Sequence, residues 1–489
     1  MSKLRKTIFI FAFVFALTLQ FFTKSAAQTI ETRIKIESLS PTILKIEGEF
    51  AEQKERNLSF ITNYAGIENL GARIFDVNLK SKIGQIVLYK KLIDGEFLAE
   101  NDFSEFEYKL KLDVPKQISA HVSWISGERG ILMLNDLLPL LKDKSSAKIT
   151  LELPENWKIS TNEKSLSANV FEVSEVEKAI FFIDKNIREK ELNVGSSKLK
   201  LLVSGEFLFT DEQAIQAASE IFAEYQKLFG AIPNKQAQIL LIRFPSDVKF
   251  GRWEAETRGR NITIVSSDMP FNTQSLQRLH EQLRHEIFHL WMPNNLNLSG
   301  NYDWFYEGFA LYQSLRLGVQ LNKLRFNDFL ETLARAHSID SLQTQKTSLI
   351  FASNNRWNGA NTQVYARGMV VAFLIDIAIL RHSKGKKSLD EVLREVYQKH
   401  NIANSRTDGN EAILAILQAN KDLQPIIEKY IKNTDKIAWQ NDLEAVGIEF
   451  SEQNFTTKLS VKAKPNGRQK DLLDKLGYNN WRKLSLNKK

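Results

Sequence analysis

Residues Arg284 to Trp291 read RHEIFHLW, in which a histidine–glutamate pair is followed by a second histidine four positions after the first. Residues four apart on an α-helix share one face, so the imidazoles of His285 and His289 can bind one metal ion. Glu286 then lies beside the ion, where a carboxylate can act as the base that activates water. The chain has only seven histidines, so this pattern is uncommon by chance. The stretch predicts a catalytic zinc site on a helix.

The preceding residues start the same pattern and do not complete it. His280-Glu281 resembles the first half of the motif, but Arg284 stands where a second imidazole would be needed. A guanidinium stays protonated and cannot coordinate a metal. We therefore expect His280 to be a surface residue or to lie behind the metal ligands.

A catalytic zinc ion needs a third protein ligand and one open position. Met292-Pro293 ends the first helix, residues 294–302 form a loop, and Asp303 can cap a second helix. That helix is rich in aromatic residues and contains Glu307, whose carboxylate costs free energy there unless it is paired or bound to metal. We expect Glu307 to be the third ligand, with one Zn²⁺ per chain, rather than a solvated helical glutamate.

Composition restricts the possible chemistry. The chain has 489 residues, 43% of them hydrophobic, which is the balance of a packed protein with two or three cores. It has no cysteine, so a disulfide framework, a thiolate metal site and a cysteine nucleophile are excluded. Any metal must be held by histidine and carboxylate.

The N-terminus has the pattern of an export signal. Three basic residues precede an apolar stretch at residues 7–19, and Ser25-Ala26-Ala27 supplies a cleavage site. We expect residues 1–27 to be a signal peptide and the mature protein to be periplasmic or secreted. The alternative is an uncleaved membrane anchor, for which the apolar stretch is short.

The net charge of +8 is unevenly distributed. The predicted signal carries +4 and residues 458–489 carry +8, which leaves about −4 for the body. A nucleic-acid-binding surface needs basic residues clustered on a folded domain. We therefore expect no nucleic-acid partner.

Periodicity divides the rest of the chain into four regions. Alternating apolar residues predict a β-rich domain at residues 28–195, which we expect to be a structural flank of the site. Mixed strands and helices predict a catalytic domain at residues 196–325, and helical periodicity fills residues 326–450. The apolar helix at residues 369–380 is too short to span a bilayer and is expected in the core. Residues 451–489 form a basic tail that we expect to be loosely attached.

The HExxH motif followed by Glu307-Gly308-Phe309 resembles the gluzincin metallopeptidases, a group that includes the aminopeptidase N and glycyl aminopeptidase families. Further similarity to the glycyl aminopeptidases covers most of residues 30–450, in stretches at residues 123–127, 153–157, 365–376 and 388–390. The resemblance implies an α+β multidomain fold with a β-rich N-terminal domain, a thermolysin-like zinc peptidase domain and a helical C-terminal region.

The resemblance also implies two further site residues. Tyr365 matches the family tyrosine that stabilises the tetrahedral oxyanion, a role suited to a phenol donor. Glu254 falls where the family places the glutamate that holds the free α-amine of the substrate. Residues 251–256 depart from the glycyl family pattern, because they lack its Gly-Gly start and the histidine after glutamate. The side-chain preference of the substrate therefore stays open.

These observations predict an exported zinc aminopeptidase acting on peptides, with Glu286 as the general base. Two alternatives remain. A zinc endopeptidase would need an open cleft and no amine anchor, and a catalytically inactive relative would use the same fold as a binding module. The sequence makes no prediction about oligomeric state.

Overall fold

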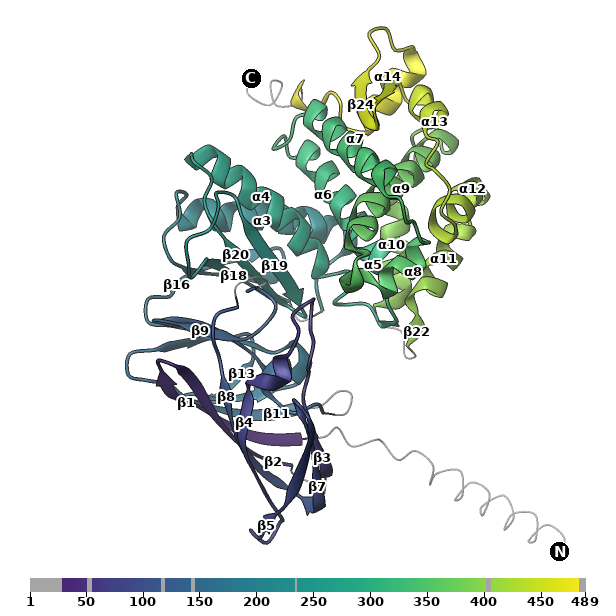
Figure 1. The fold of residues 1–489 in the computed structure, drawn as a ribbon. Coiled ribbons are helices and arrows are strands. Elements are labelled where there is room, and N and C mark those ends of the chain that lie inside the picture. The colour runs from purple at the N-terminus through teal and green to yellow at the C-terminus, as the bar shows by residue number, and fades with distance from the viewer. Residues whose placement is uncertain are drawn as a thin grey trace, which may run out of the picture.

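The computed structural model describes residues 29–50, 55–115, 119–141, 146–233, 235–401 and 406–482. The predicted signal peptide, residues 1–27, lies outside these ranges, so export stays a prediction. Figure 1 shows β-sheets at the N-terminal end, a smaller sheet covered by helices in the middle, and a helical region that holds the C-terminal end. The molecule is therefore a mixed sheet-rich and helical multidomain protein.

The N-terminal region consists of an eight-stranded, a four-stranded and a three-stranded sheet. In β1 every second residue is buried, so the alternation seen in the sequence places one face of the sheet on the core. The elements are β1 Thr29–Leu39, β2 Thr42–Phe50, β3 Glu55–Ser59, β4 Ile74–Lys80, β5 Ile86–Val87, β6 Tyr89–Ile93, β7 Glu96–Phe103, β8 Glu105–Lys111, β9 Trp124–Ser126, β10 Arg129–Met133, α2 Leu134–Leu137, β11 Ser146–Glu152, β12 Lys158–Ser160, β13 Lys164–Ser167, β14 Val170–Val173 and β15 Ile180–Asp184.

A five-stranded sheet follows, in the order β16-β17-β18-β20-β19. The strands β17, β18 and β20 are parallel, and β16 and β19 are antiparallel edges. The sheet thus begins before residue 196, where the sequence predicted a new domain. Its elements, with the two helices that cover it, are β16 Arg188–Val194, β17 Ser197–Ser204, α3 Asp211–Phe229, β18 Gln236–Arg243, β19 Trp253–Arg258, β20 Asn261–Ser266 and α4 Asn272–His289.

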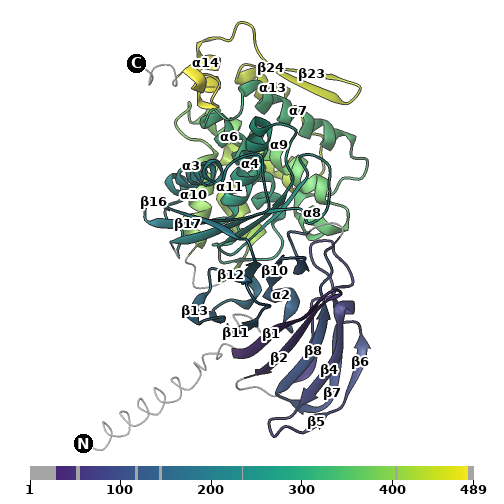
Figure 2. The same cartoon turned by 90° about the vertical axis from the view of Figure 1, so that its left-hand side faces the viewer.

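This sheet is buried on both faces. Leu199, Leu201 and Val203 of β17 belong to the core formed with α3, α4 and the later helices. Leu202, between them in the sequence, instead packs in a core shared with Trp124 of the N-terminal region. Because side chains alternate along a strand, the same strand faces both bodies. Figure 2 shows the N-terminal sheets below this sheet and the helices above it.

The remaining chain is mainly helical, and one hydrophobic core runs from Leu199 to Leu476. The predicted division at residue 325 is therefore not a break in packing. The elements are β21 Leu298–Ser299, α5 Asp303–Tyr306, α6 Gly308–Gln320, α7 Phe326–Leu342, α8 Leu349–Asn354, α9 Asn361–His382, α10 Leu389–His400, β22 Thr407–Asp408, α11 Gly409–Gln418, α12 Gln424–Ile426, α13 Gln440–Ala445, β23 Ile448–Gln453, β24 Thr456–Val461 and α14 Gly467–Lys475.

Helix α9 is longer than the sequence indicated. It has 22 residues and is the one helix in the described ranges that is long and apolar enough to cross a membrane. The expectation that it is too short was therefore wrong. Its most apolar window is 94% buried inside the molecule, which supports the expected role as a core helix.

The predicted tail is more structured than its composition suggested. Strands β23 and β24 form a hairpin that packs on α7, where the buried His337 ring lies 2.7 Å from the Thr457 hydroxyl. Leu472 and Leu473 of α14 are buried. These few apolar residues attach the segment to the helical region. The prediction of a loose tail rested on the many basic residues and did not take these apolar residues into account.

Candidate metal centre and cleft

The candidate metal ligands come from two helical segments. His285 and His289 lie one turn apart at the end of α4, and Glu307 lies between α5 and α6. All three are buried. One ligand atom from each of them lies within 4.8 Å of the others.

The distances fit a shared cation. The Nε2 atoms of His285 and His289 are 3.1 Å apart, and Oε2 of Glu307 lies 3.2 Å from the first and 3.5 Å from the second. Nδ1 of His289 lies 2.9 Å from the carbonyl oxygen of Met292. A proton on Nδ1 would donate a hydrogen bond to that carbonyl oxygen and leave the lone pair of Nε2 free to bind a metal. Two imidazoles and a carboxylate form a donor set typical of catalytic zinc.

Two glycines bring the third ligand to its place. Gly308 follows Glu307, and Gly368 lies one helical turn after Tyr365. A Cβ atom added at Gly308 would lie 2.6 Å from the backbone of Gly368, so α6 and α9 cross in direct contact. The crossing sets Glu307 and Tyr365 close together, because each lies next to the contact point.

Arg356 lies between these two residues. Its Nη1 atom is 2.8 Å from Oε1 of Glu307 and 2.9 Å from the carboxylate of Asp303, and its Nη2 donates to the hydroxyl of Tyr365. Burial alone would raise the pKa of the Glu307 carboxyl, but the positive charges of Arg356 and His289 hold it well below its usual range. Glu307 is thus ionised, as a metal ligand must be.

The phenol of Tyr365 keeps its proton at neutral pH. Burial and the nearby carboxylate of Glu307 raise its pKa well above the ordinary value. The ring of Tyr365 lies 6.4 Å from that of His285, measured between centroids. A protonated phenol at this position can donate a hydrogen bond to a group bound at the metal ligands.

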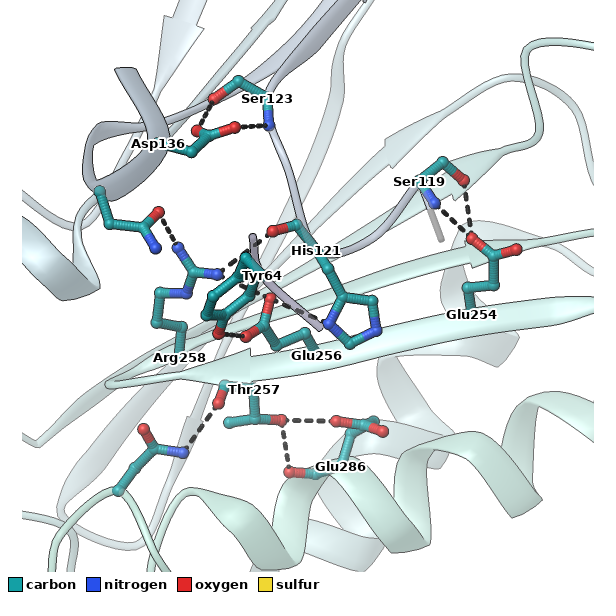
Figure 3. A network of polar contacts seen from close by, with 12 residues as sticks. Tyr64, Ser119, His121, Ser123, Asp136, Glu254, Glu256, Thr257, Arg258 and Glu286 are labelled. Atoms are coloured by element: carbon teal, nitrogen blue, oxygen red, sulfur yellow. Dashed lines mark hydrogen bonds and ion pairs between the residues drawn. The ribbon is translucent and has the colours of Figure 1, made fainter. Parts of the chain in front are cut away.

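Glu286 points toward the strand β19. The hydroxyl of Thr257 lies 2.8 Å from Oε2 of Glu286 and 3.0 Å from its backbone carbonyl oxygen (Figure 3). The side chain of Glu286 is buried, as are those of the two candidate ligands His285 and His289 on the same helix. The expected general base therefore has one defined partner.

Glu256, which precedes Thr257 on β19, is the centre of a polar cluster that joins two regions of the chain. Its carboxylate accepts from the Tyr64 hydroxyl, lies 2.9 Å from Arg258 and lies 3.3 Å from Nδ1 of His121 (Figure 3). Burial would raise the pKa of Glu256, but the charge of Arg258 and the hydrogen bonds from His121 and Tyr64 lower it to about 2. Since Tyr64 and His121 precede β9, the N-terminal region is more than the structural flank that the sequence predicted.

Glu254 occupies a different position. Its carboxylate lies 3.0 Å from the Ser119 hydroxyl and 2.6 Å from Arg252. Glu254 and Glu256 share one face of β19, since they are two residues apart. Only Glu256 belongs to the residues that line the cleft. The structure thus places Glu254 outside the cleft lining, and its expected role as the amine anchor stays a prediction.

A cleft of about 960 Å³ holds these groups. Its wall includes the candidate metal ligands, Glu286 and Tyr365 on the helical side, so the structure brings these five residues together. The other side is formed by β19 and by the N-terminal region. The residues that sequence reasoning missed are Tyr64, His121, Glu256, Thr257, Arg258 and Arg356.

His280 is not the surface residue that was one of the expected possibilities. It is buried, and its Nδ1 has no hydrogen-bond partner within the described parts of the chain. Burial, together with the charges of Lys323 and Arg284, lowers its pKa to about 4. It is therefore a neutral residue at neutral pH, and it is not part of the metal-ligand group.

Comparison of the whole chain with known proteins connects this geometry to a fold. No protein-family model and no curated protein matches the sequence. A solved structure described as an aminopeptidase N family protein from Idiomarina loihiensis superposes with a TM-score of 0.74 at 16% identity, covering 87% of this chain and 79% of that one. The chain has the gluzincin aminopeptidase fold.

A second group of structures supports the same assignment of the gluzincin fold. An M1 zinc metallopeptidase from Deinococcus radiodurans, in a variant bound to a Tyr-Ser-Ala substrate, matches with a TM-score of 0.56 at 11% identity. That match covers 84% of this chain and 95% of the other. Another structure of the same enzyme gives a TM-score of 0.52. The similarity in fold confirms the resemblance that the HExxH stretch and Glu307 first suggested.

Proposed function

We propose that the chain is a zinc-dependent aminopeptidase that removes N-terminal residues from peptides. The observation that carries this proposal is one cleft that holds His285, His289 and Glu307 together with Glu286 and Tyr365. A zinc ion held by the first three residues would act as a Lewis acid on the scissile carbonyl and make water more acidic.

Three residues of the chain then perform the proton and charge chemistry. Glu286 takes a proton from the attacking water and passes it to the leaving amine. Thr257 orients its carboxylate through the 2.8 Å contact. Tyr365 donates a hydrogen bond to the oxyanion that forms when water adds to the carbonyl.

Recognition of a free amine requires a carboxylate in the cleft, and Glu256 is better placed for this than Glu254. An ionised carboxylate has about four acceptor positions, of which Tyr64, His121 and Arg258 take three. One position is left for an ammonium group. An endopeptidase would not need this carboxylate to bind its substrate.

The test is a hydrolysis assay with the zinc-loaded chain from residue 28 to 489. Aminoacyl-arylamides with a free amine are compared with the same compounds after N-acetylation, and Glu286→Gln is the catalytic control. We expect cleavage of the free-amine substrates only, abolished in the variant. Equal cleavage of capped substrates would favour an endopeptidase, and stoichiometric zinc without cleavage of either would indicate a binding module.

Further features belong to the same proposal. We infer a thermolysin-like peptidase domain around the five-stranded sheet, which starts with β16 at Arg188 and so begins before the predicted boundary at residue 196. The helices after residue 325 share its core and form its C-terminal part. The basic start, apolar stretch and small residues at positions 1–27 support export to the periplasm or the medium. Mass spectrometry of the mature N-terminus would test this, since cleavage after Ala27 leaves Gln28 first.

A further inference from the structure

We propose that Arg356 is a positioning residue that fixes the third metal ligand and the oxyanion donor relative to each other. The proposal rests on the proposed peptidase function for its catalytic part. Arg356 belongs to neither the HExxH motif nor the helix of Glu307. It begins a short turn between α8 and α9, at Arg356–Asn358.

The two oxygens of the Glu307 carboxylate contact different partners. Oε2 of Glu307 faces the two imidazoles, and Oε1 lies 2.8 Å from Nη1 of Arg356. A carboxylate whose second oxygen is held by a guanidinium cannot rotate freely about its Cγ–Cδ bond. The ligand oxygen is therefore presented in one direction, as is common for groups behind a metal ligand.

The same guanidinium reaches the oxyanion donor. Its Nη2 donates to the Tyr365 hydroxyl, and its central carbon lies 5.1 Å from the centre of the Tyr365 ring. Because Arg356 fills one acceptor position of the phenol oxygen, the O–H bond must point elsewhere. The planar fork of arginine presents its N–H groups to both partners in a fixed geometry, whereas a lysine ammonium is a point charge on a flexible stem.

Arg356 is itself held in place. Its side chain is 11% exposed, its Nη1 lies 2.9 Å from Asp303, and its guanidinium lies 4.6 Å from the centre of the Trp357 ring. These contacts hold both terminal nitrogens and one face of the guanidinium, while Nε has no hydrogen-bond partner among the described residues. The fixed position of the guanidinium is what allows it to set the geometry of Glu307 and Tyr365.

The experiment measures zinc affinity and turnover separately in the purified full chain. Zinc dissociation constants come from competition with a chromophoric chelator, and kcat and KM come from an aminoacyl-arylamide. Arg356→Gln should weaken zinc binding about 10- to 100-fold and lower kcat more than it raises KM. Arg356→Lys keeps the charge and loses the planar fork. Its zinc affinity and its kcat should lie between those of Arg356→Gln and those of the parent protein.

A matched control separates positioning from general stability. Arg316 is similarly enclosed, with 15% of its side chain exposed, and is bound by two carboxylates, Asp376 and Asp390, but it lies outside the cleft lining. Arg316→Gln should lower the melting temperature without changing zinc affinity. In a Tyr365→Phe background, Arg356→Gln should reduce kcat by a smaller factor than it does in the parent protein.

The outcomes separate this proposal from the proposed function. If Arg356→Gln binds zinc as tightly as the parent chain, or loses no more affinity than Arg316→Gln, Arg356 does not position the ligand. Unchanged kcat in a zinc-loaded variant would overturn its action on Tyr365. If the parent chain binds zinc and cleaves no peptide, the peptidase proposal fails while the affinity comparison still tests Arg356.

Discussion

The two walls of the cleft are built by different means. The helical wall carries His285, Glu286 and His289, whose mutual positions follow from five consecutive residues of one helix. The strand wall carries Glu256, which meets Tyr64 across 192 positions of sequence and His121 from another loop. Local spacing thus determines the first wall, whereas the packing of two separate cores determines the second.

Glu286→Gln should have the largest effect and tests the helical wall alone. Removing a general base typically costs on the order of 10²- to 10⁴-fold in rate, and the amide is close in shape to the carboxylate. We expect that loss in kcat with zinc still bound, measured by an arylamide assay and metal analysis. Glu281→Gln is the matched control, because Glu281 lies in the incomplete motif and pairs with Arg278 at the surface. Retained turnover in Glu286→Gln would show that Glu286 is not the general base.

Glu256→Gln tests the strand wall. A hydrogen bond to a charged group contributes about 1.5–3 kcal/mol, which corresponds to roughly 10- to 100-fold in kcat/KM for a free-amine substrate. Most of the change should be in KM, because the amine is bound before and during the reaction.

Glu254→Gln is the comparison for Glu256, since it changes the same group two residues away on the same strand. We expect a change of less than about threefold in KM for this variant, because its carboxylate lies outside the cleft lining. A larger effect at Glu254 than at Glu256 would reverse the assignment of the amine anchor. Melting temperatures of both variants would show whether the loss of the Arg258 partner unfolds the chain instead.

Thr257→Val tests the contact between the two walls. The hydroxyl of Thr257 is on the strand, and its acceptor, the Glu286 carboxylate, is on the helix. Losing one hydrogen bond to a carboxylate, about 1.5 kcal/mol, should lower kcat about tenfold with little change in KM. Thr257→Ser keeps the hydroxyl and should retain most of the activity. Equal rates for the two variants would mean that Thr257 acts by packing alone.

Gly308→Ala should act mainly on stability and, because its contact with Gly368 sets Glu307 close to Tyr365, should also lower turnover. The added methyl would meet the backbone of Gly368, and overpacking of this kind costs about 1–3 kcal/mol. A lower melting temperature is expected, measured by calorimetry. At Gly467 an added Cβ meets no atom within 4 Å, so Gly467→Ala should leave the melting temperature unchanged or raise it slightly.

The sequence predicted the fold type and the convergence of His285, His289 and Glu307, because both depend on local patterns. His285 and His289 follow from helix periodicity, and Glu307 from a carboxylate among aromatic residues. Glu254 and Glu256 alternate on one face of β19, so nothing in their local spacing distinguishes them. Arg356 and Thr257 carried no local signal, since each acts through a contact made only when distant segments pack.

The placement of Tyr64 and His121 has a consequence for how the chain can be divided. The three candidate metal ligands and Glu286 lie after residue 196, while these two side chains lie before it. A chain cut between the sheets would leave the candidate ligands and the proposed base on one fragment. Tyr64 and His121, which form part of the other wall of the cleft, would be on the second fragment. The cleft is in this sense an interface, and its shape depends on how two bodies are docked as much as on any residue within it.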